Sequence, residues 1–181
     1  YQTAFPALIR DWRAKWGIGN FPFLFVQLPC RGTASPDPGD SACAEMRDSQ
    51  FRTLAEPATG MATIIDLGEA EELHPQNKQE VGWRLAQWAL ARTYGKAIVP
   101  SGPLYHGMKI AGGAIHLEFD HCGGGLISRD HPQLRGFTIA GEDRRFVWAE
   151  ARIEGSSIIV SSPLVPAPVA ARYAWAENPE G

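Results

Sequence analysis

His74 stands close behind two acidic residues, with Glu72 two positions before it and Glu71 three. Near neutral pH an uncharged imidazole can take a proton from a hydroxyl nucleophile and return it to a leaving group. A carboxylate on the second ring nitrogen fixes the tautomer and stabilises the imidazolium that forms. The spacing therefore predicts a general base with an orienting acid. The candidates for that acid are Glu71, Glu72 and, in reserve, Asp66.

The same residues also have a purely structural interpretation. Pro75 follows His74 directly, and polar residues before a proline often cap or mark the start of a helix. Acidic residues at that place complement the helix dipole without taking part in chemistry. Spacing alone leaves catalysis and helix capping both open.

A serine nucleophile to accompany this base is not evident. The Gly-x-Ser-x-Gly elbow does not occur. Gly39-Asp40-Ser41 matches the nucleophile block of one hydrolase superfamily, but it consists of common turn residues and does not directly follow a predicted strand. We interpret it as structural, together with the serines of the predicted linker and β turns: Ser101, Ser156, Ser157, Ser161 and Ser162.

The other histidines do not form a recognisable site. Asp130-His131-Pro132 repeats the acid-His-Pro order but falls in a predicted polar turn. His116 and His121 fit no zinc template, because no second Cys or His pair lies at ligand spacing. We expect structural or surface roles for His106, His116, His121 and His131, and no metal or organic cofactor.

The elements that must position His74 alternate between helix and strand. Periodicity and breakers predict helices over residues 4–16, about 42–54 and 75–94, and buried strands over residues 21–28 and 61–67. This alternation implies a parallel sheet with helices on its faces. The first part of the chain is therefore predicted to be α/β.

From residue 105 the pattern changes to short β segments between glycine-rich turns. They lie at residues 109–110, 114–119, 136–140, 146–153, 157–160 and 169–175. We expect a small antiparallel β-sandwich. The segment Pro100–Leu104 resembles a linker, so the predicted domains are residues 1–104 and 105–181.

Composition argues against some classes of binding partner and indicates a cellular location. The net charge of -3 and the pI near 6.0 argue against a nucleic-acid or anionic membrane surface. No apolar run reaches the ~18 residues of a spanning helix. Cys30 and Cys43 bracket a loop rich in Pro, Gly, Asp and Ser, which favours a disulfide over two unpaired thiols. The 14 Pro, 6 Trp and few Lys suit an exported protein, so we expect a periplasmic or secreted location. Because the chain opens at Tyr1 without Met, we expect a processed or excerpted piece.

Seven stretches, in order along the chain, resemble the C-terminal portion of the sialate O-acetylesterase family, a branch of the SGNH (GDSL-type) hydrolases. They are Phe5–Arg13, Phe21–Pro29, Thr59–Glu69, His74–Ala86, Ser101–Tyr105, Gly136–Gly141 and Arg172–Trp175. The resemblance implies an α/β/α sandwich with a serine esterase site, accompanied by β domains.

The resemblance also implies roles for individual residues. His74 corresponds to the family's catalytic histidine. The family places its acid two residues earlier, which is Glu72 here, whereas the wider superfamily places it three earlier, which is Glu71. The nucleophilic serine and the oxyanion-hole block belong to segments that precede this region.

The implied function is removal of O-acetyl groups from sugars, such as sialic acid, xylan or xyloglucan side chains. The partners would be the acetylated carbohydrate and an N-terminal segment of the same protein that carries the serine. The alternative is a non-catalytic carbohydrate-binding or scaffolding module that uses the aromatic residues Trp148, Tyr173 and Trp175, although core packing also explains these three.

Overall fold

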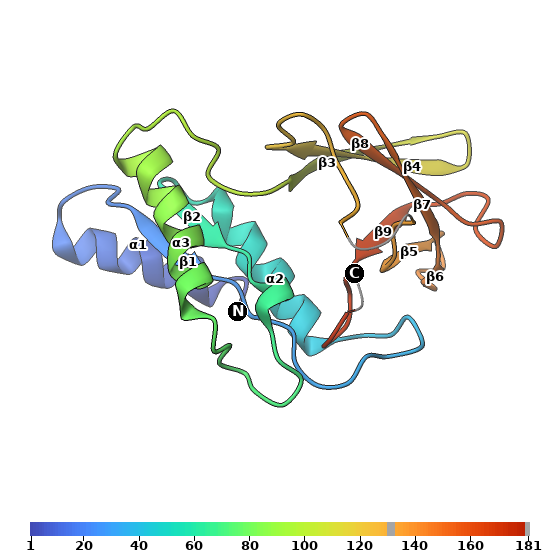
Figure 1. Ribbon diagram of the computed structural model, residues 1–181, viewed down its shortest axis with the longest axis horizontal. Helices are drawn as coiled ribbons and strands as arrows, with labels where there is room; N and C mark the ends of the chain where they lie inside the picture. Colours follow the sequence, from blue (N-terminus) through green and yellow to red (C-terminus); the bar gives the residue numbers. More distant parts are fainter. Residues whose placement is uncertain (130–132, 180–181) are drawn as a thin grey trace. The chain divides into compact units, whose positions relative to one another are not determined.

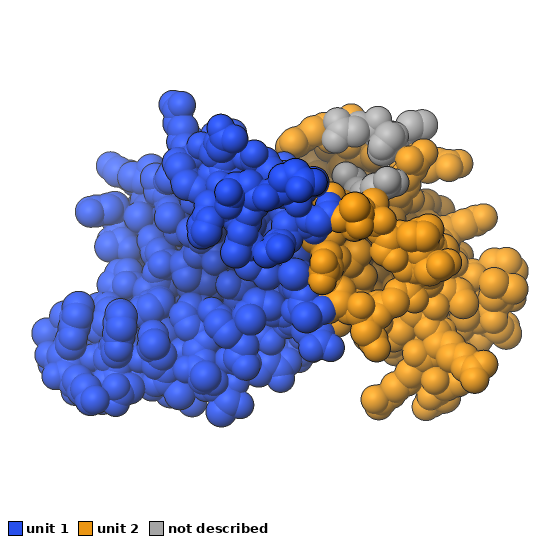
Figure 2. Space-filling view, turned by 90° about the horizontal axis from the view of Figure 1, so that it is seen from below, with its two compact units in different colours: residues 1–32, 42–101 blue, residues 33–41, 102–181 orange. Residues whose placement is uncertain are grey.

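The chain forms two compact units, and two parallel strands lie at the centre of the first unit (Figure 1). The computed structural model describes residues 1–129 and 133–179. The first unit comprises residues 1–32 and 42–101, and the second comprises residues 33–41 and the chain from 102 onward, as coloured in Figure 2.

The first unit alternates helix and strand as expected. Its main elements are α1 (Ala4–Trp16), β1 (Phe23–Val26), α2 (Ala42–Arg52), β2 (Thr59–Ala62) and α3 (Lys78–Trp88). Short turns of other helix types follow three of them, at Thr53–Ala55, Ile65–Leu67 and Ala89–Thr93. β1 and β2 pair in parallel, from Phe23 opposite Thr59 to Val26 opposite Ala62. This pairing confirms the predicted α/β fold class.

Helices cover both faces of the strand pair. Successive side chains of a strand point to opposite faces, so β1 presents alternate residues to α1 and to α3. Phe23 and Phe25 pack edge-on against Phe5 of α1, with ring centroids 6.0 and 5.0 Å apart. Leu24 and its neighbour Gly60 lie on the opposite face, against α3. The strands that carry the site are thus held between α1 and α3.

Gly60 allows α3 to approach β2 closely. A Cβ at Gly60 would lie 2.7 Å from the ring of Trp88, which is 4% exposed. The indole Nε1 of Trp88 donates to the carbonyl of Met61 at 2.7 Å, so the buried donor has a partner. This contact fixes the distance between β2 and the helix that follows the site loop.

The predicted boundaries around the loop were partly wrong. β2 begins at Thr59 and ends at Ala62, because the chain turns into the short helix Ile65–Leu67 instead of remaining extended to residue 67. α3 begins at Lys78 rather than Pro75, since Asn77 caps it by accepting from the backbone N–H of Glu80 at 3.1 Å. The strand predicted over 21–28 is limited to Phe23–Val26.

The predicted disulfide between Cys30 and Cys43 is also wrong, because both are free thiols. Cys30 is buried against Gly68, where an added Cβ would lie 2.5 Å from the Cys30 sulfur and 2.1 Å from its carbonyl oxygen. The sulfur therefore packs against the site loop. The loop between the two cysteines needs no covalent link to place it.

The second unit consists of two antiparallel sheets, as expected for a small sandwich. One sheet has the order β3-β4-β8-β7 and the other β6-β5-β9. Their strands are β3 (Leu104–Ala111), β4 (Ala114–Asp120), β5 (Phe137–Ala140), β6 (Val147–Trp148), β7 (Glu150–Glu154), β8 (Ser157–Ser161) and β9 (Ala170–Tyr173). The core is formed by Ile115, Leu117, Phe137, Ile139, Val160 and Val165, from both sheets.

Two features of this unit differ from the expectation. The single strand predicted over 146–153 is two strands, β6 and β7, which belong to different sheets and separate at Ala149. Residues 33–41 belong to this unit, where the Pro36 carbonyl accepts from the Trp148 indole at 3.1 Å. No helix among the described residues is long and apolar enough to cross a membrane.

The close approach at Gly60 leads to a stability prediction. We expect Gly60→Ala to lower the free energy of unfolding by about 1–3 kcal/mol, because its methyl group overlaps the Trp88 ring. Gly82→Ala is the matched control: it lies within α3 with no atom in reach of an added Cβ, and should stabilise by about 0.5–1 kcal/mol. Urea unfolding of the two variants measures both values, and equal stabilities would contradict the packing.

Candidate functional site

The loop between β2 and α3 carries His74 at the carboxyl end of the parallel strands. In open α/β sheets, ligands bind at this end of the strands. The segment that follows β1 reaches the same place, because the N–H of Gly32 donates to the carbonyl of Ala70 at 2.8 Å and Cys30 packs against Gly68. The two segments after β1 and β2 therefore support each other.

Asp66, the reserve candidate for the acid, has a structural task instead. Both of its carboxylate oxygens accept from the guanidinium of Arg84, at 2.6 and 2.7 Å. Arg84 also donates to the Thr63 carbonyl at 2.6 Å and to Glu80 at 3.0 Å. These ion pairs raise the pKa of the Arg84 guanidinium, first through the hydrogen bond to Asp66. Arg84 thus joins the start of the loop to α3, and Asp66 does not orient His74.

The far end of the loop is closed by Glu69 and Gln76. One oxygen of the Glu69 carboxylate accepts from the backbone N–H of Gln76 at 2.8 Å, and the other lies 3.3 Å from the Gln76 side-chain amide nitrogen. Glu69 and Glu72 also form an isolated antiparallel β-bridge. The loop is therefore a hydrogen-bonded turn that presents residues 70–75 together.

Glu72 holds His74 through two hydrogen bonds to one oxygen. Its Oε1 accepts from the backbone N–H of His74 at 2.8 Å and lies 3.0 Å from the ring Nδ1. An ionised carboxylate only accepts, so Nδ1 carries the proton of that bond and Nε2 of the neutral ring keeps its lone pair. The structure brings Glu72, and not the exposed Glu71, to the imidazole.

The charge on Glu72 is stabilised by this arrangement. The pKa of Glu72 is lowered, mainly by the hydrogen bond from the His74 backbone N–H and next by that from the ring. Glu72 therefore stays ionised, and so remains an acceptor, to a lower pH than an ordinary glutamate. The His74 side chain is 81% exposed, so its Nε2 edge is accessible to a hydroxyl supplied from outside the described residues.

A second histidine–carboxylate pair, His106 with Asp120, has a similar ring contact in a different part of the fold. Nδ1 of His106 lies 3.1 Å from Asp120, and both side chains are exposed on the strands β3 and β4. No backbone N–H of His106 shares that carboxylate among the hydrogen bonds of the described residues. The pair lies on a sheet rather than at the end of parallel strands, which makes it a useful control.

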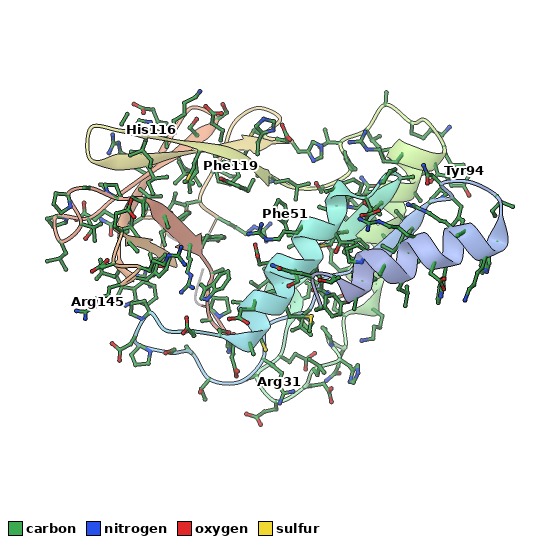
Figure 3. The ribbon with its side chains drawn as sticks, turned by 180° about the vertical axis from the view of Figure 1, so that it is seen from behind. Arg31, Phe51, Tyr94, His116, Phe119 and Arg145 are labelled. Atoms are coloured by element: carbon green, nitrogen blue, oxygen red, sulfur yellow. The ribbon has the colours of Figure 1, made fainter. Side chains whose placement is uncertain are left out.

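The remaining candidates take no part in the His74 loop. His116, labelled in Figure 3, belongs to β4. Ser41 directly precedes α2, and Ser101 ends the first unit. Asp130-His131-Pro132 lies outside the described residues. Within the described part of the chain, no group of three His, Cys, Asp or Glu residues could hold a metal ion.

Comparison with known proteins finds relatives among the sialate O-acetylesterases. Sialate O-acetylesterase of Mus musculus is 30% identical over 204 aligned residues, which include 99% of this chain and 37% of the mouse protein. The Homo sapiens sialate O-acetylesterase is 34% identical over 120 residues, which include 58% of this chain and 23% of the human protein. No protein-family model matches.

A solved structure agrees with the fold as well. The crystal structure of a novel carbohydrate acetylesterase from Xanthomonas citri is 45% identical and has a TM-score of 0.90. The similarity covers 99% of this chain and 41% of the Xanthomonas chain. The chain thus spans less than half the length of each of these relatives.

The double hydrogen bond to Glu72 predicts a pH titration. Because the pKa of Glu72 is lowered in the folded loop, its stabilising effect is complete above the ordinary glutamate pKa of about 4.3 and is lost as the pH falls through the lower folded value. The amide-proton chemical shift of His74, followed by NMR, should report that midpoint. Glu71→Gln should leave the titration unchanged and Glu72→Gln should abolish it. Loss in Glu71→Gln instead would contradict the assignment.

Proposed function

The chain belongs to the sialate O-acetylesterase family, and on that premise we propose that it supplies the general base of a carbohydrate O-acetylesterase. The observation that carries the proposal is the bond between Glu72 and Nδ1 of His74. It leaves Nε2 as the basic atom, on an exposed ring at the carboxyl end of parallel strands.

In the proposed first half-reaction, a serine hydroxyl attacks the carbonyl carbon of a sugar acetyl ester. Nε2 of His74 takes the serine proton as the C–O bond forms, and Glu72 stabilises the resulting imidazolium through Nδ1. The tetrahedral oxyanion needs donors, typically worth about 3–4 kcal/mol each. Collapse of the intermediate expels the sugar oxygen, which takes the proton from His74.

In the second half-reaction, water takes the place of the serine. His74 removes a proton from the water as it attacks the acetyl-serine, and returns that proton to the serine oxygen as acetate leaves. The net reaction consumes one water and yields a free sugar hydroxyl and acetate. No redox partner or group carrier enters this balance.

We place the nucleophilic serine and the oxyanion donors on a segment N-terminal to this region of the protein. Two observations support that placement. The relatives are more than twice as long as the matched portion, and the serines that the sequence offered lie at the start of α2, at the end of the first unit or in the second unit. The division of residues 1–104 and 105–181 into a hydrolase part and an accessory β part stays a prediction.

The proposed substrates are acetylated sugars. The names of the relatives, sialate O-acetylesterase and carbohydrate acetylesterase, support this class. Sialic acid esters and acetylated plant polysaccharides such as xylan or xyloglucan are the proposed members of it. The periplasmic or secreted location stays a prediction.

Replacing the base tests the proposal most simply. In the polypeptide that includes the serine-bearing segment, His74→Ala should lower kcat for acetate release from an acetylated sugar by ~10³-fold or more. His106→Ala removes the comparable but unrelated pair with Asp120 and should leave kcat unchanged. Near-normal kcat in His74→Ala would exclude this histidine from the mechanism.

The acid is assigned by a matched pair of substitutions. Glu72→Gln should lower kcat by ~10²-fold or more, because an amide in that place can donate to Nδ1 and favour the wrong tautomer. Glu71→Gln keeps the contact and should retain activity. Steady-state kinetics with p-nitrophenyl acetate measure both, and the reverse order of effects would refute Glu72 as the orienting acid.

A further inference from the structure

The second unit contains a pocket that the proposed reaction does not use. Its volume is about 560 Å³, within the range of roughly 300–1,000 Å³ that ligand sites occupy. The walls come from the segment 34–36, residues 134–136 before β5, Phe137 and Thr138 of β5, Trp148 and Ala149 at the end of β6, and residues 174–176, 178 and 179 beyond β9. All of these belong to one unit, so the pocket is formed within it.

One wall of the pocket is a fixed aromatic surface. The Trp148 side chain is held by the bond from its Nε1 to the Pro36 carbonyl at 3.1 Å, yet the residue is 48% exposed. A pyranose ring presents C–H groups on one face, and these pack favourably on the electron-rich face of an indole. Trp148 thus offers a preorganised surface at little cost in side-chain entropy.

A second tryptophan, Trp175, also lines the pocket. The ring of Trp175 is covered by the Arg172 guanidinium, whose Cζ lies 4.3 Å from the ring centroid. Its Nε1 is buried and has no hydrogen-bond partner among the described residues. Packing against Arg172 therefore explains the ring of Trp175, and its donor is left without an acceptor.

Two polar groups in the walls have no partner. Besides Nε1 of Trp175, the hydroxyl of Thr138 on β5 is unsatisfied, although Thr138 is only 4% exposed. Buried polar groups in native proteins nearly always have a partner, because an unpaired group has lost its hydrogen bonds to water without replacing them. Both residues line the pocket, and a polar ligand with hydroxyl groups would satisfy these atoms after a shift of the walls that exposes them.

The described lining of the pocket carries one positive charge. Arg135 is the one charged residue among the described residues that line it, and no carboxylate does so. Arg135 is exposed and makes no ion pair among the described contacts. A guanidinium in this setting is suited to a carboxylate, which it can bind through two parallel hydrogen bonds.

We propose that this pocket binds an acidic saccharide, with a pyranose ring on Trp148, its carboxylate at Arg135, and its hydroxyl groups toward Thr138 and Trp175. The choice of a saccharide rests on the proposed function. The pocket would hold the acetylated chain by a sugar unit other than the one being deacetylated.

The test measures binding and not turnover. The 181-residue chain is titrated with N-acetylneuraminic acid and glucuronic acid as acidic probes and with xylotetraose as the neutral probe, while the indole Nε1–H signals are followed by NMR. We expect both acidic probes to shift the Trp148 and Trp175 signals and to bind at least tenfold more tightly than xylotetraose. No shift of these signals, or equal affinity for xylotetraose, would overturn the proposal.

Matched substitutions inside and outside the pocket distinguish loss of binding at this site from a general effect of mutation. Arg135→Gln should remove the preference for the acidic probes, whereas Arg152→Gln, at another exposed arginine of the same unit, should keep it. Trp148→Ala should weaken binding at least tenfold, whereas Trp83→Ala, at an exposed tryptophan of α3, should not. Unchanged affinity in Arg135→Gln would refute the site even if Trp148→Ala proved unstable.

The outcomes distinguish this proposal from the esterase proposal. Probe binding without acetate release by the serine-bearing polypeptide would support a binding module and refute the esterase. Acetate release that depends on His74, without probe binding, would refute the pocket alone.

Discussion

One carboxylate oxygen determines how the candidate site is arranged. Oε1 of Glu72 accepts from both the backbone N–H and the ring Nδ1 of His74, so the same atom shapes the turn and orients the imidazole. The backbone bond has the larger effect on the pKa of Glu72. The turn that holds the Glu72 carboxylate in its ionised form therefore also places it at the imidazole ring. The structural and catalytic interpretations of the sequence are thus compatible.

That turn depends on contacts further into the unit. Arg84 joins Asp66 at its start to α3, and Trp88 holds α3 against Gly60 of β2. Cys30 packs against Gly68 from the segment after β1. These contacts place an exposed histidine on a rigid support at the end of a parallel strand pair, which is where an α/β fold can combine residues from several loops.

The sequence predicted most of the elements, whereas the catalytic role that it predicts for His74 stays a prediction. Periodicity identified the helix over 4–16 and the two apolar strands, and acid-His spacing identified His74. It could not choose between Glu71 and Glu72, because both are in reach along an unfolded loop and the choice is made by the turn that Glu69 and Gln76 close. Contacts distant in sequence, such as Cys30 with Gly68, leave no local pattern, and the predicted disulfide was wrong for that reason.

A crystal structure of the proposed esterase with its serine-bearing segment, after reaction with a phosphonate ester, would test the central proposal most directly. Such reagents label an activated serine and imitate the tetrahedral intermediate. The proposal predicts one labelled serine from outside residues 1–181, with an oxygen about 2.6–3.2 Å from Nε2 of His74 and with Glu72 still bonded to Nδ1. A labelled serine served by another base, with His74 remote from it, would contradict the proposal.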